Sequence, residues 1–70
     1  MRDDIREQLR TDLYARRVSV TSLAAELNMS RVNLSRMLNG QLEGRFEIWE
    51  QIAAKVGKRF TLTGLEQDNA

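Results

Sequence analysis

Two amphipathic segments lie almost end to end in the middle of the chain, and this spacing restricts the fold more than any other feature. The first segment repeats apolar residues at the i, i+3, i+4, i+7 positions of one helical face, namely Val20, Leu23, Ala24 and Leu27. Asn28 then tolerates the left-handed backbone that ends a helix, and Ser30 is a preferred N-cap for a helix over residues 31–38. Only Asn28 and Met29 separate the first helix from that cap. A turn so short predicts two helices that cross steeply and share one core.

Helical periodicity also describes the chain on both sides of this pair. A first helix near residues 3–16 is predicted from an apolar stripe formed by Ile5, Leu9 and Leu13. Ser19 is the predicted N-cap of the second helix, with Thr21 as the alternative. After a loop at residues 41–45, a fourth helix has an apolar face made of Phe46, Trp49, Ile52, Ala53 and Val56. Gly57 is a natural residue to follow the C-terminus of that helix.

The C-terminal segment has a different period. Residues 59–63 alternate polar and apolar side chains and include aromatic and β-branched types, which predicts a short strand. No partner strand is obvious, so Phe60 and Leu62 would project from a strand that is unpaired within the chain. Residues 65–70 are expected to form a flexible polar tail. We therefore expect one all-α domain over residues 1–64, with four to five helices and a short C-terminal β-strand.

The residue types that are missing exclude several kinds of chemistry. The 70 residues include no Cys and no His, so no disulfide, standard zinc ligand set or imidazole acid–base group can form. The two lysines flank a helix end, and the four glycines are scattered rather than gathered in a phosphate-binding loop. We expect no enzyme activity, no cofactor and no metal. No apolar run approaches the ~20 residues of a membrane span, which predicts a soluble, cytoplasmic protein.

The helix over residues 31–38 has an unusual outward face. The net charge of +1 is too small to identify a partner, so the placement of the charges has to decide. On a helical wheel, Leu34, Met37 and Leu38 face inward. The opposite side is a strip made of Arg31, Val32, Asn33, Ser35 and Arg36. This helix contains no acidic residue, whereas a face built only for solubility typically carries Glu and Lys.

Residues 19–57 resemble the helix-turn-helix domain of phage repressor, Cro and XRE-type regulators. The matching positions follow one another without a gap and comprise Leu23-Ala24, Ser30, Leu34-Ser35-Arg36, Asn39-Gly40, Phe46, Trp49, Ile52-Ala53 and Val56-Gly57. Asn28 stands where the family usually has a glycine, and the stripe at positions 5, 9 and 13 would supply the family's first helix. The resemblance implies a lambda-repressor-like fold and binding to double-stranded DNA.

The resemblance also implies roles for single residues. The third helix would enter the major groove and read bases through Arg31, Val32, Asn33, Ser35 and Arg36. Arg can donate two hydrogen bonds to guanine, Asn can pair with adenine, and Val can pack on a thymine methyl. Phosphate contacts would come from Ser19, Thr21, Ser30, Gln41, Gly44 and Arg45. For the two arginines of the strip, a phosphate contact or a solvated side chain is the alternative to base reading.

The chain departs from the family in two places that bear on affinity. Val20 stands where the family often has a glutamine that bonds a phosphate, and Glu43 lies in a loop that is frequently basic. Both changes predict modest affinity for DNA. The lost basic residues also predict a weaker dependence of binding on salt.

A domain of this size reads only a few base pairs, so we expect a homodimer on a palindromic operator. The candidate dimer residues are Leu42, Ile48, Phe60 and Leu62; alternatively, Phe60 and Leu62 cover the helical bundle. The expected function is a transcriptional regulator, most simply a repressor, located with the nucleoid. Two alternatives are an antitoxin-like protein that binds a partner through its C-terminal strand and represses its own operon, and a helical adaptor that binds protein rather than DNA.

Overall fold

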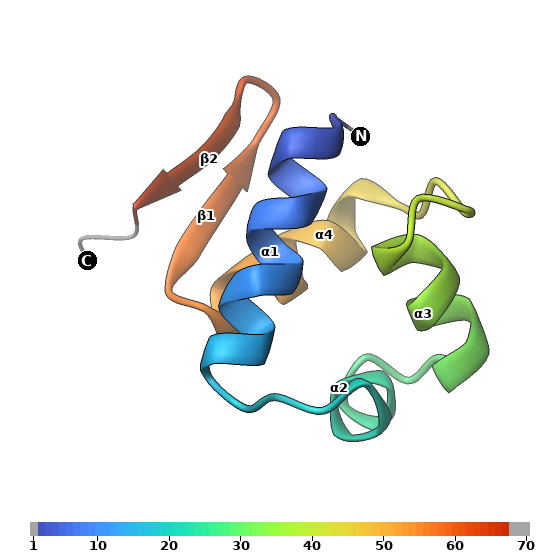
Figure 1. Cartoon of the computed structure of the whole chain (residues 1–70). Coiled ribbons are helices and arrows are strands. Elements are labelled where there is room, and N and C mark those ends of the chain that lie inside the picture. Colours follow the sequence, from blue (N-terminus) through green and yellow to red (C-terminus); the bar gives the residue numbers. More distant parts are fainter. Residues whose placement is uncertain (1, 68–70) are drawn as a thin grey trace.

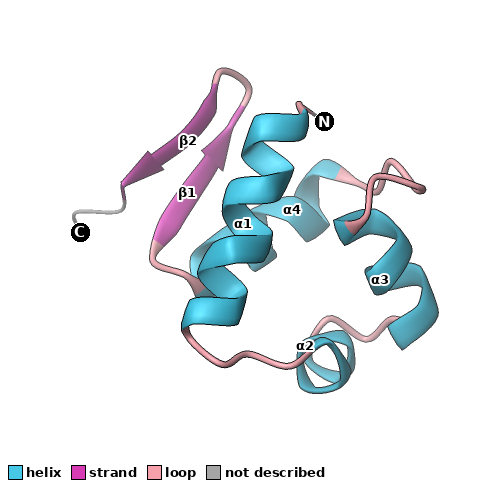
Figure 2. Ribbon diagram, viewed as in Figure 1, coloured by secondary structure: helices cyan, strands magenta, loops and turns pink. Residues whose placement is uncertain are grey.

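The computed structural model describes residues 2–67 and contains four helices followed by a β-hairpin (Figure 1, Figure 2). The helices are α1 (Asp3–Ala15), α2 (Val20–Glu26), α3 (Arg31–Leu38) and α4 (Phe46–Lys55). The strands are β1 (Lys58–Thr61) and β2 (Gly64–Gln67). The mainly helical architecture and the positions of all four helices confirm the sequence predictions. None of the helices within residues 2–67 has the length and apolar character needed to cross a membrane.

One apolar core joins the four helices. Most of the apolar residues that periodicity predicts for the helices are buried, but Phe46 of α4 is 37% exposed, and Val20 and Leu27 are only half-buried. The side chains that are almost completely inaccessible are Leu9, Leu23, Leu34, Met37, Ile52 and Val56. Burying a side chain of this size contributes roughly 1.5–3 kcal/mol. Trp49 is also buried, and its indole Nε1 donates a hydrogen bond of 2.9 Å to the carbonyl oxygen of Glu43. The core therefore holds α3 and the loop that follows it against the other helices.

The short turn between α2 and α3 forms as the sequence predicts. The Ser19 hydroxyl accepts a hydrogen bond of 3.1 Å from the backbone N–H of Ser22, which makes Ser19 rather than Thr21 the N-cap of α2. The Ser30 hydroxyl accepts an equivalent bond of 3.0 Å from the Asn33 N–H. Asn28 has a φ of 58°, in the left-handed region that asparagine tolerates. These local interactions set the direction in which α3 leaves the turn.

The C-terminal region differs from the sequence prediction. The strand predicted at residues 59–63 has a partner after all, because β1 pairs with β2 in antiparallel fashion, with Phe60 opposite Leu65. Residues 65–67 therefore belong to a strand rather than to a polar tail, and residues 68–70 lie outside the described part. Gly64, with a φ of 140°, allows the chain to reverse after two turn residues. Leu65 then packs against the core next to β1, which anchors β2.

The hairpin and α3 lie on opposite sides of α1 in the view of Figure 1. β1 packs against α4, and α1 contacts both α3 and α4. Two ion pairs add connections between elements that are distant in sequence: Lys55 with Glu26, at 2.7 Å, and Lys58 with Asp12. The candidate binding strip on α3 is therefore well separated from the hairpin in this fold.

Candidate nucleic-acid interface

The outward strip predicted for α3 is present as a solvent-facing surface. Arg31, Val32, Asn33 and Arg36 are exposed, and Ser35 is half-buried. The opposite face of the helix is sealed, because Leu34, Met37 and Leu38 are only 0%, 1% and 6% exposed. Val32 is 52% exposed although it is apolar. The helix therefore presents a mixed cationic, amide and aliphatic surface on a rigid support, as groove reading requires.

The arginines of the strip have no electrostatic partner within residues 2–67, and this separates them from most other cations of the chain. Side-chain hydrogen bonds and ion pairs engage Arg2, Arg6, Arg10, Lys55 and Lys58, and Arg59 stands opposite Glu66 in the hairpin. Five arginines make no side-chain hydrogen bond or ion pair with any residue in the range 2–67: Arg16, Arg17, Arg31, Arg36 and Arg45. Three of these five lie on α3 or at the start of α4, where the sequence predicts DNA contacts. Their charge is thus available to an anionic ligand.

Two of the residues predicted to bind phosphate, Ser19 and Ser30, also stabilise the N-termini of helices. Both the Ser19 and the Ser30 hydroxyl cap a helix, and Ser19 also donates a hydrogen bond of 2.9 Å to the hydroxyl of Ser22. Thr21 is exposed in the first turn of α2. The capping geometry accounts for both serines without a ligand, so their phosphate role stays a prediction.

The loop between α3 and α4 brings Gln41 and Arg45 to the surface, and both are exposed. Gly44 also has a structural role. The position of its missing side chain faces inward, where a Cβ would lie 2.9 Å from the Met37 sulfur and 3.1 Å from Trp49 Nε1. With a φ of 78°, Gly44 lets the loop close over the core. A phosphate contact through its backbone N–H stays a prediction.

Arg6 supports the C-terminal end of α3, a role that was not predicted from the sequence. Its Nη1 donates a hydrogen bond of 3.1 Å to the carbonyl oxygen of Leu38, the last residue of α3. Its side chain is only 12% exposed and also pairs with Asp3 and Glu7. A Cβ placed on Gly40 would lie 3.0 Å from Arg6 Cζ, so the guanidinium packs closely against the turn that ends α3. Its spacing of three residues from Leu9 was a usable signal, because that spacing places it beside the buried stripe.

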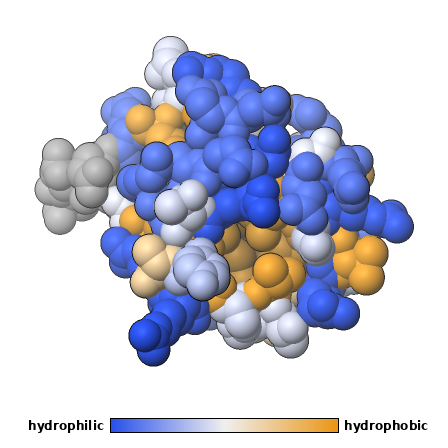
Figure 3. Space-filling view, viewed as in Figure 1, coloured by the Kyte–Doolittle hydropathy of each residue, from blue (hydrophilic) through white to orange (hydrophobic). Residues whose placement is uncertain are grey.

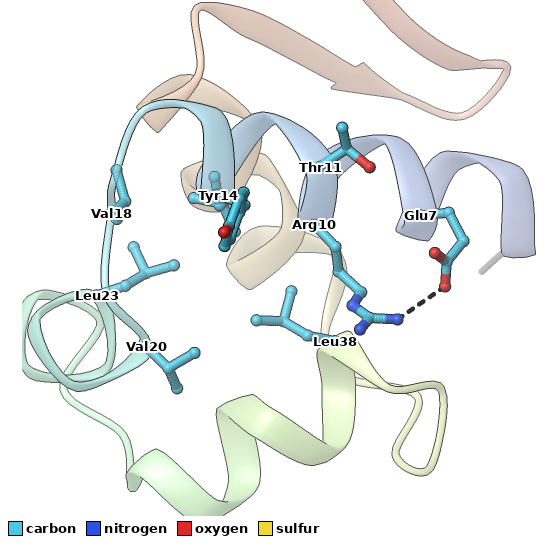
Figure 4. Close-up of a pocket in the computed structure, with 9 residues that line it drawn as sticks. Glu7, Arg10, Thr11, Tyr14, Val18, Val20, Leu23 and Leu38 are labelled. Atoms are coloured by element: carbon cyan, nitrogen blue, oxygen red, sulfur yellow. Dashed lines mark hydrogen bonds and ion pairs between the residues drawn. The ribbon is translucent and has the colours of Figure 1, made fainter.

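An apolar hollow of about 410 Å³ opens between α1, α2 and α3 and is visible in the space-filling view (Figure 3). Val20, Leu23 and Leu38 point into it, and Tyr14 stands at its edge (Figure 4). Val20 is half-buried and packs against the core. This contact explains the departure from the glutamine of the helix-turn-helix pattern: at position 20 the chain has an apolar side chain that extends the core instead of a phosphate donor.

The four candidate dimer residues divide into two groups. Ile48 and Phe60 are partly buried and pack against the core, and the Phe60 ring lies 4.9 Å from the ring of Phe46. Leu42 and Leu62 are 42% and 93% exposed. Leu62 is placed at the hairpin turn, where no core is available to cover it. Leu42 and Leu62 are therefore the better candidates for a contact with a second copy.

Comparison with known proteins gave no match to a family model, a curated protein or a solved structure. Within residues 2–67, no group of three or more carboxylate, His or Cys side chains is arranged to hold a metal ion.

Proposed function

We propose that this protein is a sequence-specific double-stranded DNA-binding regulator, most simply a repressor, in which α3 lies in the major groove. The observation that carries the proposal is the exposed strip on α3, in which Arg31 and Arg36 have no partner within residues 2–67 while the opposite face is sealed by the core. A cationic helix without acidic residues fits the major groove, which admits one α-helix. The resemblance of residues 19–57 to helix-turn-helix regulators supports the same function.

The chemistry of the strip matches base edges. Arg31 and Arg36 would each donate two hydrogen bonds to the O6 and N7 atoms of guanine, and Asn33 would pair with adenine. Val32, exposed on the same strip, would pack against the methyl group of thymine. Arg45 and Gln41, on the loop that follows, would contact phosphates and so set the position of α3 in the groove.

Two copies would provide the affinity that one small domain lacks. A two-fold dimer reads two half-sites separated by about one helical turn, roughly 34–36 Å. Within residues 2–67, β2 pairs on one side only, with β1. An edge strand of this kind exposes backbone N–H and C=O groups that can pair with another strand. We infer that the hairpin edge and Leu62 form the dimer contact, on the far side of α1 from α3 in the view of Figure 1.

The experiment is selection of binding sites from a random double-stranded DNA pool at about 0.1 M salt, where phosphate contacts stay strong. The wild type is compared with Arg31→Ala/Arg36→Ala. The matched control is Arg2→Ala/Arg10→Ala, which removes two exposed arginines that are paired with carboxylates on α1. We expect an enriched inverted repeat for the wild type and the control, and none for the strip variant.

The selection also separates the proposal from its rivals. Equal enrichment by the wild type and the strip variant would show that α3 does not read bases. No enrichment by any protein would favour the adaptor, whose partner would be a protein. The antitoxin-like alternative remains if DNA is bound and a second protein pairs with the edge of β2, so a purified operator complex would also be tested for an additional polypeptide.

A further inference from the structure

Arg17 has a backbone conformation that an arginine rarely adopts. Over residues 2–67, only Arg17 and Asn28 combine a side chain with a positive φ, at 57° and 58°. Asparagine visits this left-handed region readily because its short polar side chain bonds locally, whereas for longer side chains the clash between Cβ and the following carbonyl is unfavourable. A residue that persists in such a conformation invites a functional explanation.

The fold requires the left-handed turn but does not require an arginine there. The Arg17 N–H donates to the carbonyl oxygen of Tyr14, and the Val18 N–H donates to that of Leu13, both at 3.0 Å. This pattern ends α1, and glycine is the residue that usually occupies such a position. The backbone turn would therefore form at least as well with glycine at position 17.

The neighbouring Arg16 has a place in the fold, whereas Arg17 has none. A Cβ added to Gly57 would lie 3.4 Å from Arg16 Nη2, so the Arg16 guanidinium lies close to the C-terminal end of α4, where helix dipoles favour positive charge. The Arg17 side chain is exposed and makes no hydrogen bond or ion pair within residues 2–67. Five arginines make no hydrogen bond or ion pair within residues 2–67. Arg16 lies beside the end of α4, and Arg31, Arg36 and Arg45 have proposed DNA contacts, so Arg17 alone among the five has no role assigned so far.

The position of Arg17 suits contact with the DNA backbone. It lies two residues before Ser19, the N-cap of α2, and lines the same shallow depression as Ser19 and Tyr14. The connection from Arg17 to α2 is anchored, because Val18 before Ser19 and Val20 at the start of α2 pack against the core. The cation is thus attached to the start of the two-helix unit that carries α3, and no described carboxylate competes for it.

From the strained backbone, the exposure and the missing partner, we propose that Arg17 is a phosphate-binding residue. It would contact a phosphodiester of the DNA outside the bases read by α3. The inference rests on the DNA-binding function proposed above and adds a contact that neither the sequence pattern nor the resemblance indicated. Such a contact raises affinity for any duplex, because phosphates carry no sequence information.

The variant Arg17→Gly separates this role from a purely structural one, because the two predict different combinations of results. Glycine relieves the backbone strain, so thermal stability should stay level or rise. Affinity for duplex DNA should nevertheless fall, by a similar factor for the selected operator and for a scrambled duplex of equal length. Because one phosphate contact adds about 0.9 to the salt slope, the affinity ratio of wild type to variant should shrink about 3.5-fold from 50 to 200 mM salt.

Two further variants complete the experiment. Arg17→Lys keeps the charge and should retain most of the salt slope. Arg2→Ala is the control for loss of one positive charge, because Arg2 is engaged with Asp4, whose pKa its hydrogen bond holds below the ordinary value. It should leave the slope unchanged.

Each outcome decides the proposal. If Arg17→Gly keeps the wild-type affinity and slope on a duplex that the wild type binds, Arg17 is not a phosphate contact, and the proposed function stands. If Arg17→Gly weakens binding to the operator alone, the residue reads sequence and the phosphate assignment is wrong. If the wild type binds no duplex at any salt concentration, the proposed function and this inference fall together.

Discussion

Replacement of Arg6 by methionine should destabilise the protein far more than its position on an apparently polar helix face suggests. Methionine keeps much of the length of the side chain but removes the donor to the Leu38 carbonyl oxygen, which lies 3.1 Å from Nη1. A hydrogen bond from a charged donor contributes about 1.5–3 kcal/mol. The ion pairs to Asp3 and Glu7 add little, because those carboxylates are 87% and 56% exposed and screened by water.

These contributions predict a loss of about 2–3 kcal/mol in the free energy of unfolding. A domain of 70 residues has a total of roughly 4–10 kcal/mol, so the variant should still fold. The midpoint of thermal unfolding should fall by on the order of 10–20 °C. The fluorescence of Trp49, the single tryptophan, follows unfolding directly because its indole is buried in the native core.

Arg10→Met is the matched control for this measurement. Arg10 lies on the same helix and also pairs with Glu7, at 2.9 Å. Its side chain, however, is 43% exposed and donates no hydrogen bond to a backbone carbonyl within residues 2–67. Its replacement should change stability by no more than about 0.5 kcal/mol. Equal effects of the two variants would refute the claim that Arg6 stabilises the end of α3.

Two further predictions concern the loop and the hairpin. Gly44→Ala should lower the free energy of unfolding by roughly 2–4 kcal/mol, measured by urea unfolding, because it combines a strained φ of 78° with a Cβ in close contact with Met37 and Trp49. A change below about 0.5 kcal/mol would mean that the loop relaxes freely. Leu62→Glu should leave the thermal midpoint of the dilute monomer unchanged, since Leu62 is 93% exposed, but should weaken self-association in sedimentation experiments. Unaltered self-association of Leu62→Glu would remove Leu62 from the dimer contact.

Much of the helical part was predictable because the signals that specify it are local. A serine cap bonds the N–H three residues later, as Ser19 and Ser30 do, and the apolar spacing that buries Leu34, Met37 and Leu38 repeats within two turns. The exposed strip on α3 follows from the same periodicity, because the residues that face the core determine which residues of the helix face the solvent. The candidate DNA-reading surface could therefore be located without knowledge of the tertiary fold.

The features that escaped prediction depend on residues far apart in the chain or on weak local patterns. β2 contains one large apolar residue, Leu65, so its sequence has no alternation to mark it as a strand; its pairing with β1 and its contact with the core stabilise it. The bond from Arg6 to the Leu38 carbonyl joins positions 32 residues apart. The inward direction of Gly44 depends on where Met37 and Trp49 meet. Periodicity and capping act over three or four residues, whereas these three features arise only when packing brings distant segments into contact.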